Sequence, residues 1–222
     1  MQDLSTPSPV PTSLLLTINS LPPLLVSSSQ LATDLHPELI RQLSHSRPQV
    51  RKAAVLVLGS LWSTSPSGSA LPVSQETIVD KLAEKLLDDD PSVVGATVNV
   101  MLEMARACKN EEDRVPFLRL APECFDLLTS STNNWTLIKL IKLFALLTPV
   151  EPRLVRKLLP PLTSLITTTP AMSLLYECIH AVIAGGMLVD NEPLAKTCVT
   201  KLATFLQDSD QNREHVLPQV LI

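Results

Sequence analysis

The sequence contains few aromatic residues and few glycines, and each shortage narrows the class of protein. Only seven of its 222 residues are aromatic and only five are glycine. β-Sandwiches and β-barrels need aromatic and β-branched strands joined by glycine-rich turns. The charge is nearly balanced as well, because 18 Lys and Arg face 22 Asp and Glu, a formal net charge of −4. The composition therefore argues against an all-β fold and against a basic nucleic-acid-binding surface.

The sequence also lacks a long uninterrupted apolar run. The most apolar stretch near the start, residues 13–26, is broken by Asn19 and by Pro22-Pro23. It is shorter than the ~20 residues that a membrane-spanning helix needs. Residues 1–12 contain Asp3 and no Lys or Arg, which is unlike a secretory signal peptide. We therefore predict a cytoplasmic protein that is neither secreted nor membrane-spanning.

Cysteine is scarce and is not arranged for metal binding. Cys108, Cys124, Cys178 and Cys198 form no CxxC pair, and each lies within an apolar helical pattern. Free buried thiols are expected from this pattern, rather than disulfides or zinc ligands.

What the sequence does contain is leucine and proline. It has 41 leucines and 19 prolines, and 45% of its residues are hydrophobic. No segment alternates with the period of two that a half-buried strand requires. The apolar content is also too high for a disordered chain. These features predict an all-α protein in which proline marks the helix ends.

Polar turns recur along the chain at a regular interval. They lie at residues 44–48, 88–91, 130–134, 167–170 and 207–210, and their last residues are 43, 43, 36 and 40 positions apart. This is the period of two-helix HEAT or armadillo repeats. We therefore predict a right-handed α-solenoid of about five helix pairs over residues 13–212. It is preceded by a disordered leader at 1–12 and followed by a divergent tail at 213–222.

The helices themselves are predicted from apolar periodicity and from their starts. Pro48, Pro91 and Pro170 suit a first helical turn, and Asp90 and Thr169 are candidate N-caps. Ser173, Glu177 and His180 form a single polar stripe, as expected for a helix packed between neighbours. Residues 63–72 are expected to form a flexible connection. The predicted helices are 13–28, 31–44, 48–63, 74–87, 91–109, 115–128, 133–148, 151–167, 170–185, 192–207 and a fragment from 210.

A family resemblance lies in the middle of the chain. Residues 131–144 (STNNWTLIKLIKLF), 147–154 (LTPVEPRL) and 171–179 (AMSLLYECI) resemble the large-subunit trunk of the heterotetrameric vesicle-coat adaptors, the adaptins. Within that family they are most similar to the delta-type subunits of the third adaptor complex. Shorter matches lie at residues 51–54 (RKAA), 88–92 (DDDPS), 96–100 (ATVNV) and 208–212 (DSDQN).

The resemblance implies a non-enzymatic scaffold and a partial chain. Adaptins of this kind hold a small, a medium and a second large subunit. They act in vesicle-mediated protein transport from the Golgi and endosomes towards vacuoles or lysosomes, as peripheral components of those membranes. The alternative is another HEAT or armadillo scaffold, such as a karyopherin-like transport receptor or a phosphatase scaffold. Helix 192–207 carries an apolar flank, so the isolated chain is also expected to self-associate.

No catalytic constellation, metal site or cofactor site is predicted. The histidines at positions 36, 45, 180 and 215 are scattered and share no short motif with a cysteine or carboxylate. Residues 88–90 (DDD) precede Pro91, where carboxylates cap a helix more often than they bind a metal. Gly185-Gly186 is expected to end a helix and lacks the spacing of a phosphate-binding loop.

Two groups of residues are candidates for binding or for structural roles. Lys139, Lys142, Arg153, Arg156 and Lys157 form a local basic cluster, which is either an ordinary solvated face or a surface for partner subunits or anionic lipid. Asn134 and Trp135 are interpreted as structural residues. The asparagines would cap a helix, and the tryptophan would form a core wedge between adjacent repeats.

Overall fold

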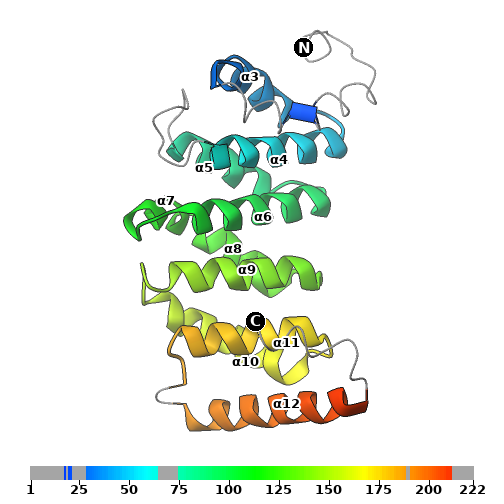
Figure 1. Cartoon of the computed structure of the whole chain (residues 1–222), viewed down its shortest axis with the longest axis vertical. Coiled ribbons are helices and arrows are strands. Elements are labelled where there is room, and N and C mark those ends of the chain that lie inside the picture. The colour runs from blue at the N-terminus through cyan, green and yellow to red at the C-terminus, as the bar shows by residue number, and fades with distance from the viewer. Residues whose placement is uncertain (1–17, 19, 22–28, 65–74, 189–190, 212–222) are drawn as a thin grey trace. The chain divides into compact units, whose positions relative to one another are not determined.

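The computed structural model describes residues 18, 20–21, 29–64, 75–188 and 191–211, and every regular element within this part of the chain is helical (Figure 1). The elements are α3 (Ser29–Gln42), α4 (Pro48–Thr64), α5 (Gln75–Leu86), α6 (Pro91–Ala107), η1 (Glu112–Arg114), α7 (Val115–Leu118), α8 (Ala121–Ser130), α9 (Asn134–Leu147), α10 (Leu154–Thr168), α11 (Met172–Ala184) and α12 (Glu192–Gln211). The predicted all-α fold is confirmed. The leader 1–12, the tail 213–222, most of the link 63–72 and nearly all of the predicted helix 13–28 lie outside the described residues.

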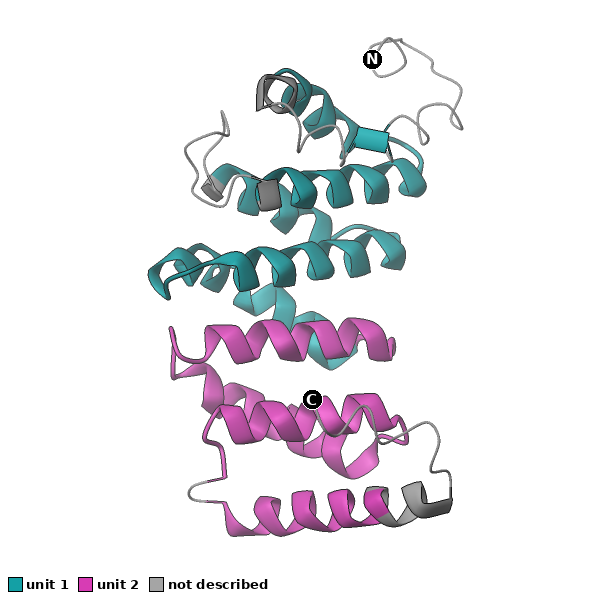
Figure 2. Ribbon diagram, viewed as in Figure 1, with its two compact units in different colours: residues 1–130 teal, residues 131–222 magenta. Residues whose placement is uncertain are grey.

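The chain divides into two compact units, residues 1–130 and residues 131–222 (Figure 2). In unit 1, α4 packs against α6, while α3 packs on α4 and α5 packs on α6. In unit 2, α9 packs against α11, and α10 packs against both α11 and α12. Within each unit, successive helix pairs therefore stack on one another, as the repeat period predicts.

Helix α6 forms much of the core of unit 1. Ten of its residues are buried, from Val93 to Ala105, as expected for a helix surrounded by its neighbours. Gly59 lies at the closest approach of α4 to α6, because a Cβ atom placed there would be 2.8 Å from Val100 Cγ1. Val100 is itself buried and stiff at χ1, so glycine is what allows these two helices to approach so closely.

Two of the three prolines that were predicted to begin a helix do so. Helices α4 and α6 begin at Pro48 and Pro91, and the Asp90 carboxylate accepts a hydrogen bond from the Ser92 backbone N–H at 2.8 Å. The third prediction was wrong. Helix α11 begins at Met172, and Thr169 instead ends α10 while its hydroxyl accepts from the Ala171 N–H at 3.2 Å.

The predicted helix 115–128 is also corrected, because the structure divides it into α7 and α8. Pro122 explains the break. It has no N–H to donate to the carbonyl of Leu118, and its ring would collide with that carbonyl in a continuous helix. In contrast, α10 continues through Pro160 and Pro161. The carbonyls that lose their donors there belong to Arg156 and Lys157, which are exposed to water.

Helix α11 ends at the predicted glycines. Gly186 has a φ of +65°, its N–H donates to the Ile183 carbonyl, and the Met187 N–H donates to the Val182 carbonyl. This is a Schellman motif, in which glycine is favoured because other residues pay a steric cost in the left-handed region. Met187 then turns back and is buried beneath the helix end, with 6% of its surface exposed.

All four cysteines are buried thiols that form no disulfide among the described residues, as predicted. Burial raises the pKa of the Cys124 thiol to about 12, and it raises the pKa of Cys178 to the same value. Both side chains therefore act as small apolar core residues at neutral pH. Among the described residues, no helix is long and apolar enough to cross a bilayer.

Candidate interaction surfaces

An ion pair joins two successive turns of unit 1. The Arg51 guanidinium donates to both carboxylate oxygens of Asp88, at 2.8 Å and 2.6 Å, and it also donates to the backbone carbonyls of His45 and Ser46. The Arg51 and Asp88 side chains are 15% and 4% exposed. Lys85 approaches the same carboxylate at 3.6 Å. The hydrogen bonds from Arg51 hold the pKa of Asp88 below its ordinary value, against the opposing effect of burial.

The sequence pointed to these two segments but not to their pairing. Residues 51–54 and 88–92 were among the short matches to adaptins, yet Arg51 and Asp88 are 37 positions apart. The repeat period could have indicated this pairing. Arg51 lies three positions after Pro48, and Asp88 lies three positions before Pro91. Stacking one repeat on the next brings these equivalent turns together.

Two of the three carboxylates at 88–90 therefore have structural partners. Asp88 binds Arg51, and Asp90 caps α6, with its pKa lowered chiefly by a hydrogen bond from the Ser92 hydroxyl. Over the described ranges, no group of three or more Cys, His, Asp or Glu side chains is arranged to hold a metal ion.

The five residues of the predicted basic cluster do not form one continuous group of free cations. Lys142 on α9 pairs with Glu177 of α11 at 3.1 Å, and Arg153 makes a two-pronged pair with Glu151 in the turn before α10. The partner arginine also lowers the pKa of Glu151. Lys139 on α9, and Arg156 and Lys157 on α10, have no carboxylate within ion-pair distance in the described part of the chain. The structure thus separates the cluster into an α9 part and an α10 part.

The prediction that Trp135 is a core wedge was wrong. Trp135 is 74% exposed, although nearly all of the other large side chains of α9 are buried. An asparagine cap was predicted at this helix start, and the capping residue is Asn133 rather than Asn134. The Asn133 side-chain oxygen accepts hydrogen bonds from the backbone N–H groups of Trp135 and Thr136, at 3.0 Å and 3.4 Å. Asn134 is the first residue of the helix and is exposed.

The polar stripe expected on α11 is solvated only in part. Ser173 and His180 are exposed, but Glu177 is 7% exposed and lies against α9 through Lys142. The His180 Nδ1 atom is 3.8 Å from the other Glu177 oxygen, and its ring stacks on Tyr176 with centroids 6.1 Å apart. Glu177 therefore locks two neighbouring helices of unit 2 together. Spacing alone could not separate this buried position from the exposed ones.

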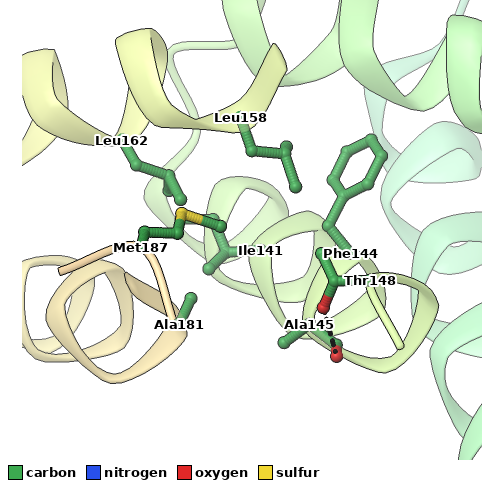
Figure 3. Close-up of a pocket in the computed structure, with 8 residues that line it drawn as sticks. All are labelled: Ile141, Phe144, Ala145, Thr148, Leu158, Leu162, Ala181 and Met187. Atoms are coloured by element: carbon green, nitrogen blue, oxygen red, sulfur yellow. Dashed lines mark hydrogen bonds between the residues drawn. The ribbon is translucent and has the colours of Figure 1, made fainter. Parts of the chain in front are cut away.

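Unit 2 also contains a small cavity between α9, α10 and α11 (Figure 3). Its volume is about 10 Å³, which is room for a single water molecule. Thr148 is the polar member of its lining, and its hydroxyl donates to the Ala145 carbonyl at 3.1 Å. This cavity is too small and too apolar to bind a substrate. On α12, Val199 and Leu206 are 67% and 52% exposed, and self-association through them stays a prediction.

Stacked helix pairs are typical of helical-repeat proteins of the HEAT or armadillo class. Comparison with known proteins identifies the family: the model of the adaptin N-terminal region matches residues 1–221, and the chain belongs to the adaptins. The delta subunit of the AP-3 complex from Schizosaccharomyces pombe is 47% identical over 194 residues, covering 86% of this chain and 22% of that protein. The AP-3 complex subunit delta-1 of Bos taurus is 43% identical over 220 residues, covering 97% of this chain and 17% of that protein.

A structural comparison agrees with this membership. A chain in a homology model of the full-length AP-3 complex, in an intermediate open conformation, matches with a TM-score of 0.71 and 32% identity. The match covers 94% of this chain and 34% of that chain. An engineered protein with 14% identity and a TM-score of 0.59 shares the fold alone. The chain therefore spans about a fifth of the length of the curated relatives that it matches.

Proposed function

We propose that this chain is a scaffold segment of the large subunit of an adaptor complex of the AP-3 type. It acts by binding other proteins, without catalysis, in vesicle-mediated transport between the Golgi or endosomes and the vacuole or lysosome. Its partners are the small, medium and second large subunits of the same complex. It works in the cytoplasm, at the surface of Golgi and endosomal membranes.

The observation that carries the proposal is the similarity to AP-3 delta subunits along nearly the whole chain. Identity reaches 47% with the fission yeast relative and 43% with the bovine one. The geometry supports a scaffold as well, because stacked helix pairs present extended surfaces on which partners can dock. The cavity between α9, α10 and α11 offers no room for a substrate.

The basic residues have a proposed role in this scaffold. Lys139, Arg156 and Lys157 have no carboxylate partner in the described part of the chain, so their charge is available to an acidic partner surface or to anionic lipid. Charges of this kind set orientation and association rate more than final affinity. The paired residues Lys142 and Arg153 contribute less, since part of their charge is already neutralised.

Co-expression with the other adaptor subunits tests this function. The chain carries an affinity tag, and the small, medium and second large subunits of the same organism's AP-3-type complex are expressed with it. We expect at least one of these subunits to co-purify with the tagged chain. Replacing Lys139, Arg156 and Lys157 with Glu should slow the association, most visibly at low salt, because exposed charges are screened over ~8–10 Å.

A matched control uses cations that already have partners. Arg106 and Lys196 pair with Glu103 and Glu192 on exposed helix faces. Replacing these two cations with Glu should leave the association rate unchanged. Capture of basic localisation peptides or of a small GTPase, with no adaptor subunit retained, would instead identify a transport receptor and refute the proposal.

A further inference from the structure

Helix α9 keeps one stripe of side chains at the surface and buries most of the rest. The stripe consists of exposed Trp135 and of half-buried Lys139 and Lys142. They are spaced four and three residues apart and therefore lie on one face of the helix. Trp135 is 74% exposed, whereas the other tryptophan of the chain, Trp62, is 5% exposed. A large exposed tryptophan on an otherwise buried helix loses hydrophobic stabilisation unless something covers it.

The backbone of Trp135 is held in a fixed position. Its N–H donates to the Asn133 side chain, and the helix that follows is anchored by buried residues such as Leu137, Ile138 and Phe144. A rigidly presented tryptophan loses little conformational entropy when a partner covers it, which is why tryptophan is common among residues that dominate binding energies.

The unpaired charge on α9 and α11 has one sign. Helix α9 carries two lysines and no acidic residue, and the single acid on α11, Glu177, is buried and paired with Lys142. Lys139 has no carboxylate partner in the described part of the chain. None of the exposed residues of α11 is an acid; they are Met172, Ser173, Tyr176, His180, Ile183 and Ala184. The surface of α9 and α11 thus presents cations, aromatic rings and apolar side chains without a free carboxylate.

We infer that the α9 stripe docks an acidic segment of a partner protein, in which an apolar side chain covers Trp135 and carboxylates pair with Lys139. A membrane surface is the less suitable occupant. Polybasic membrane sites use about four to eight cations, and this stripe has two, one of which is already paired. The inference rests on the proposed scaffold function only in that the partner is a protein.

The exposure of Trp135 provides a direct experiment on the 222-residue chain. Acrylamide should quench the fluorescence of exposed Trp135 and leave that of buried Trp62 largely unaffected. The probe is a short synthetic peptide in which a Leu-Phe pair is flanked by glutamates. We expect this peptide to protect Trp135 from acrylamide. A peptide with lysines in place of the glutamates, and one with alanines in place of Leu-Phe, should give no protection.

Variants assign the binding to the stripe. Fluorescence anisotropy of the labelled acidic peptide should show that Trp135→Ala weakens binding at least about tenfold. Lys139→Glu should weaken it about fivefold at low salt, and less as salt is added. Lys196→Glu is the matched control, because it makes the same charge change at an exposed position of α12 in the same unit, and binding should not change.

Equal protection by all three peptides would overturn the inference. So would an equal loss of binding in Lys196→Glu and Lys139→Glu, or protection of Trp135 by phosphatidylserine vesicles but not by the acidic peptide. Failure of this surface is distinguishable from failure of the scaffold function. If Trp135→Ala lost the acidic peptide while adaptor subunits still co-purified with it, scaffold function would remain and the stripe would be confirmed as a separate docking site. If the acidic peptide failed to bind wild type while the subunits co-purified, only the stripe would be refuted.

Discussion

The two units of the chain hold their neighbouring helix pairs together with different polar contacts. In unit 1 the contact lies between turns, where Arg51 and Asp88 form a two-pronged pair whose side chains are 15% and 4% exposed. In unit 2 it lies between helix faces, where Lys142 and Glu177 meet through a single contact and are 34% and 9% exposed. A turn contact fixes the start of one repeat relative to the end of another. A face contact resists sliding of two helices but leaves one charge in water.

Helix pairs that repeat with the same period can therefore be held together by different polar contacts. The same helix-pair period is kept while the polar contact moves from the turn to the helix face. We therefore expect substitutions in unit 1 to have larger effects on stability than the corresponding substitutions in unit 2, because a shielded charge that loses its partner is costly.

The largest effect should come from breaking the turn contact. Arg51→Ala leaves the Asp88 carboxylate nearly buried without its main partner, and we expect the free energy of unfolding to fall by about 2–3 kcal/mol. Denaturation followed through the fluorescence of Trp62, a buried residue of unit 1, measures this. Arg119→Ala is the control, since its pair with Asp80 is more than half exposed and should contribute less than about 0.5 kcal/mol. Equal losses in the two variants would show that the shielding of Arg51 and Asp88 has no energetic consequence.

The same contact predicts a pH dependence. The pKa of Asp88 is lower in the folded protein than its ordinary value, so its contribution to stability is fully present at neutral pH. That contribution is lost as the pH falls below about 5 and through the lowered pKa of Asp88. Asp88→Asn should therefore lower stability at pH 7 and reduce the slope of stability against pH in the acid range. An unchanged slope, measured by urea denaturation at several pH values, would contradict this assignment.

The close approach of α4 and α6 should give the next effect. Gly59→Ala places a Cβ atom 2.8 Å from Val100, and we expect a net loss of about 1–2 kcal/mol after the helix preference of alanine is counted. Adding Val100→Ala should recover part of the loss, which a double-mutant cycle would detect as a favourable coupling. If Gly59→Ala alone raised the melting temperature, the two helices would not be in tight contact at this point.

The smallest effect is expected at Trp135. Because this side chain is 74% exposed, Trp135→Ala should change the free energy of unfolding by less than about 0.5 kcal/mol. Trp62→Ala, in the core of unit 1, should by comparison cost about 3–5 kcal/mol. Thermal melts of both variants make the comparison. A loss at Trp135 as large as that at Trp62 would restore the wedge between repeats that the sequence suggested.

The sequence was sufficient for the repeat period and for most helix bounds, because those depend on local chemistry. Pro48, Pro91 and the cap at Asp90 act within one turn, and the glycine at position 186 ends α11 for a local reason. The break at Pro122 is also local, but the apolar periodicity continues across residues 115–128 and conceals it.

The exposure of single side chains and the contacts between repeats were harder to predict. Helix α9 is apolar around most of its circumference, so its sequence does not show that Trp135 points outwards while Phe144 points inwards. Glu177 looked solvated because its spacing matches that of Ser173 and His180, and its burial depends on Lys142 in a different helix. Pairings across a repeat, such as that of Arg51 with Asp88, depend on how the repeats stack.

A segment exchange tests the central claim, that this chain is a working piece of an adaptor large subunit. The matching 194-residue segment of the Schizosaccharomyces pombe AP-3 delta subunit, which is 47% identical, is replaced by the corresponding residues of this chain. Assembly with the other AP-3 subunits is then measured by co-purification. We expect the exchanged subunit to be helical by circular dichroism and to assemble with those subunits. A folded, helical subunit that remains outside the complex would contradict the claim.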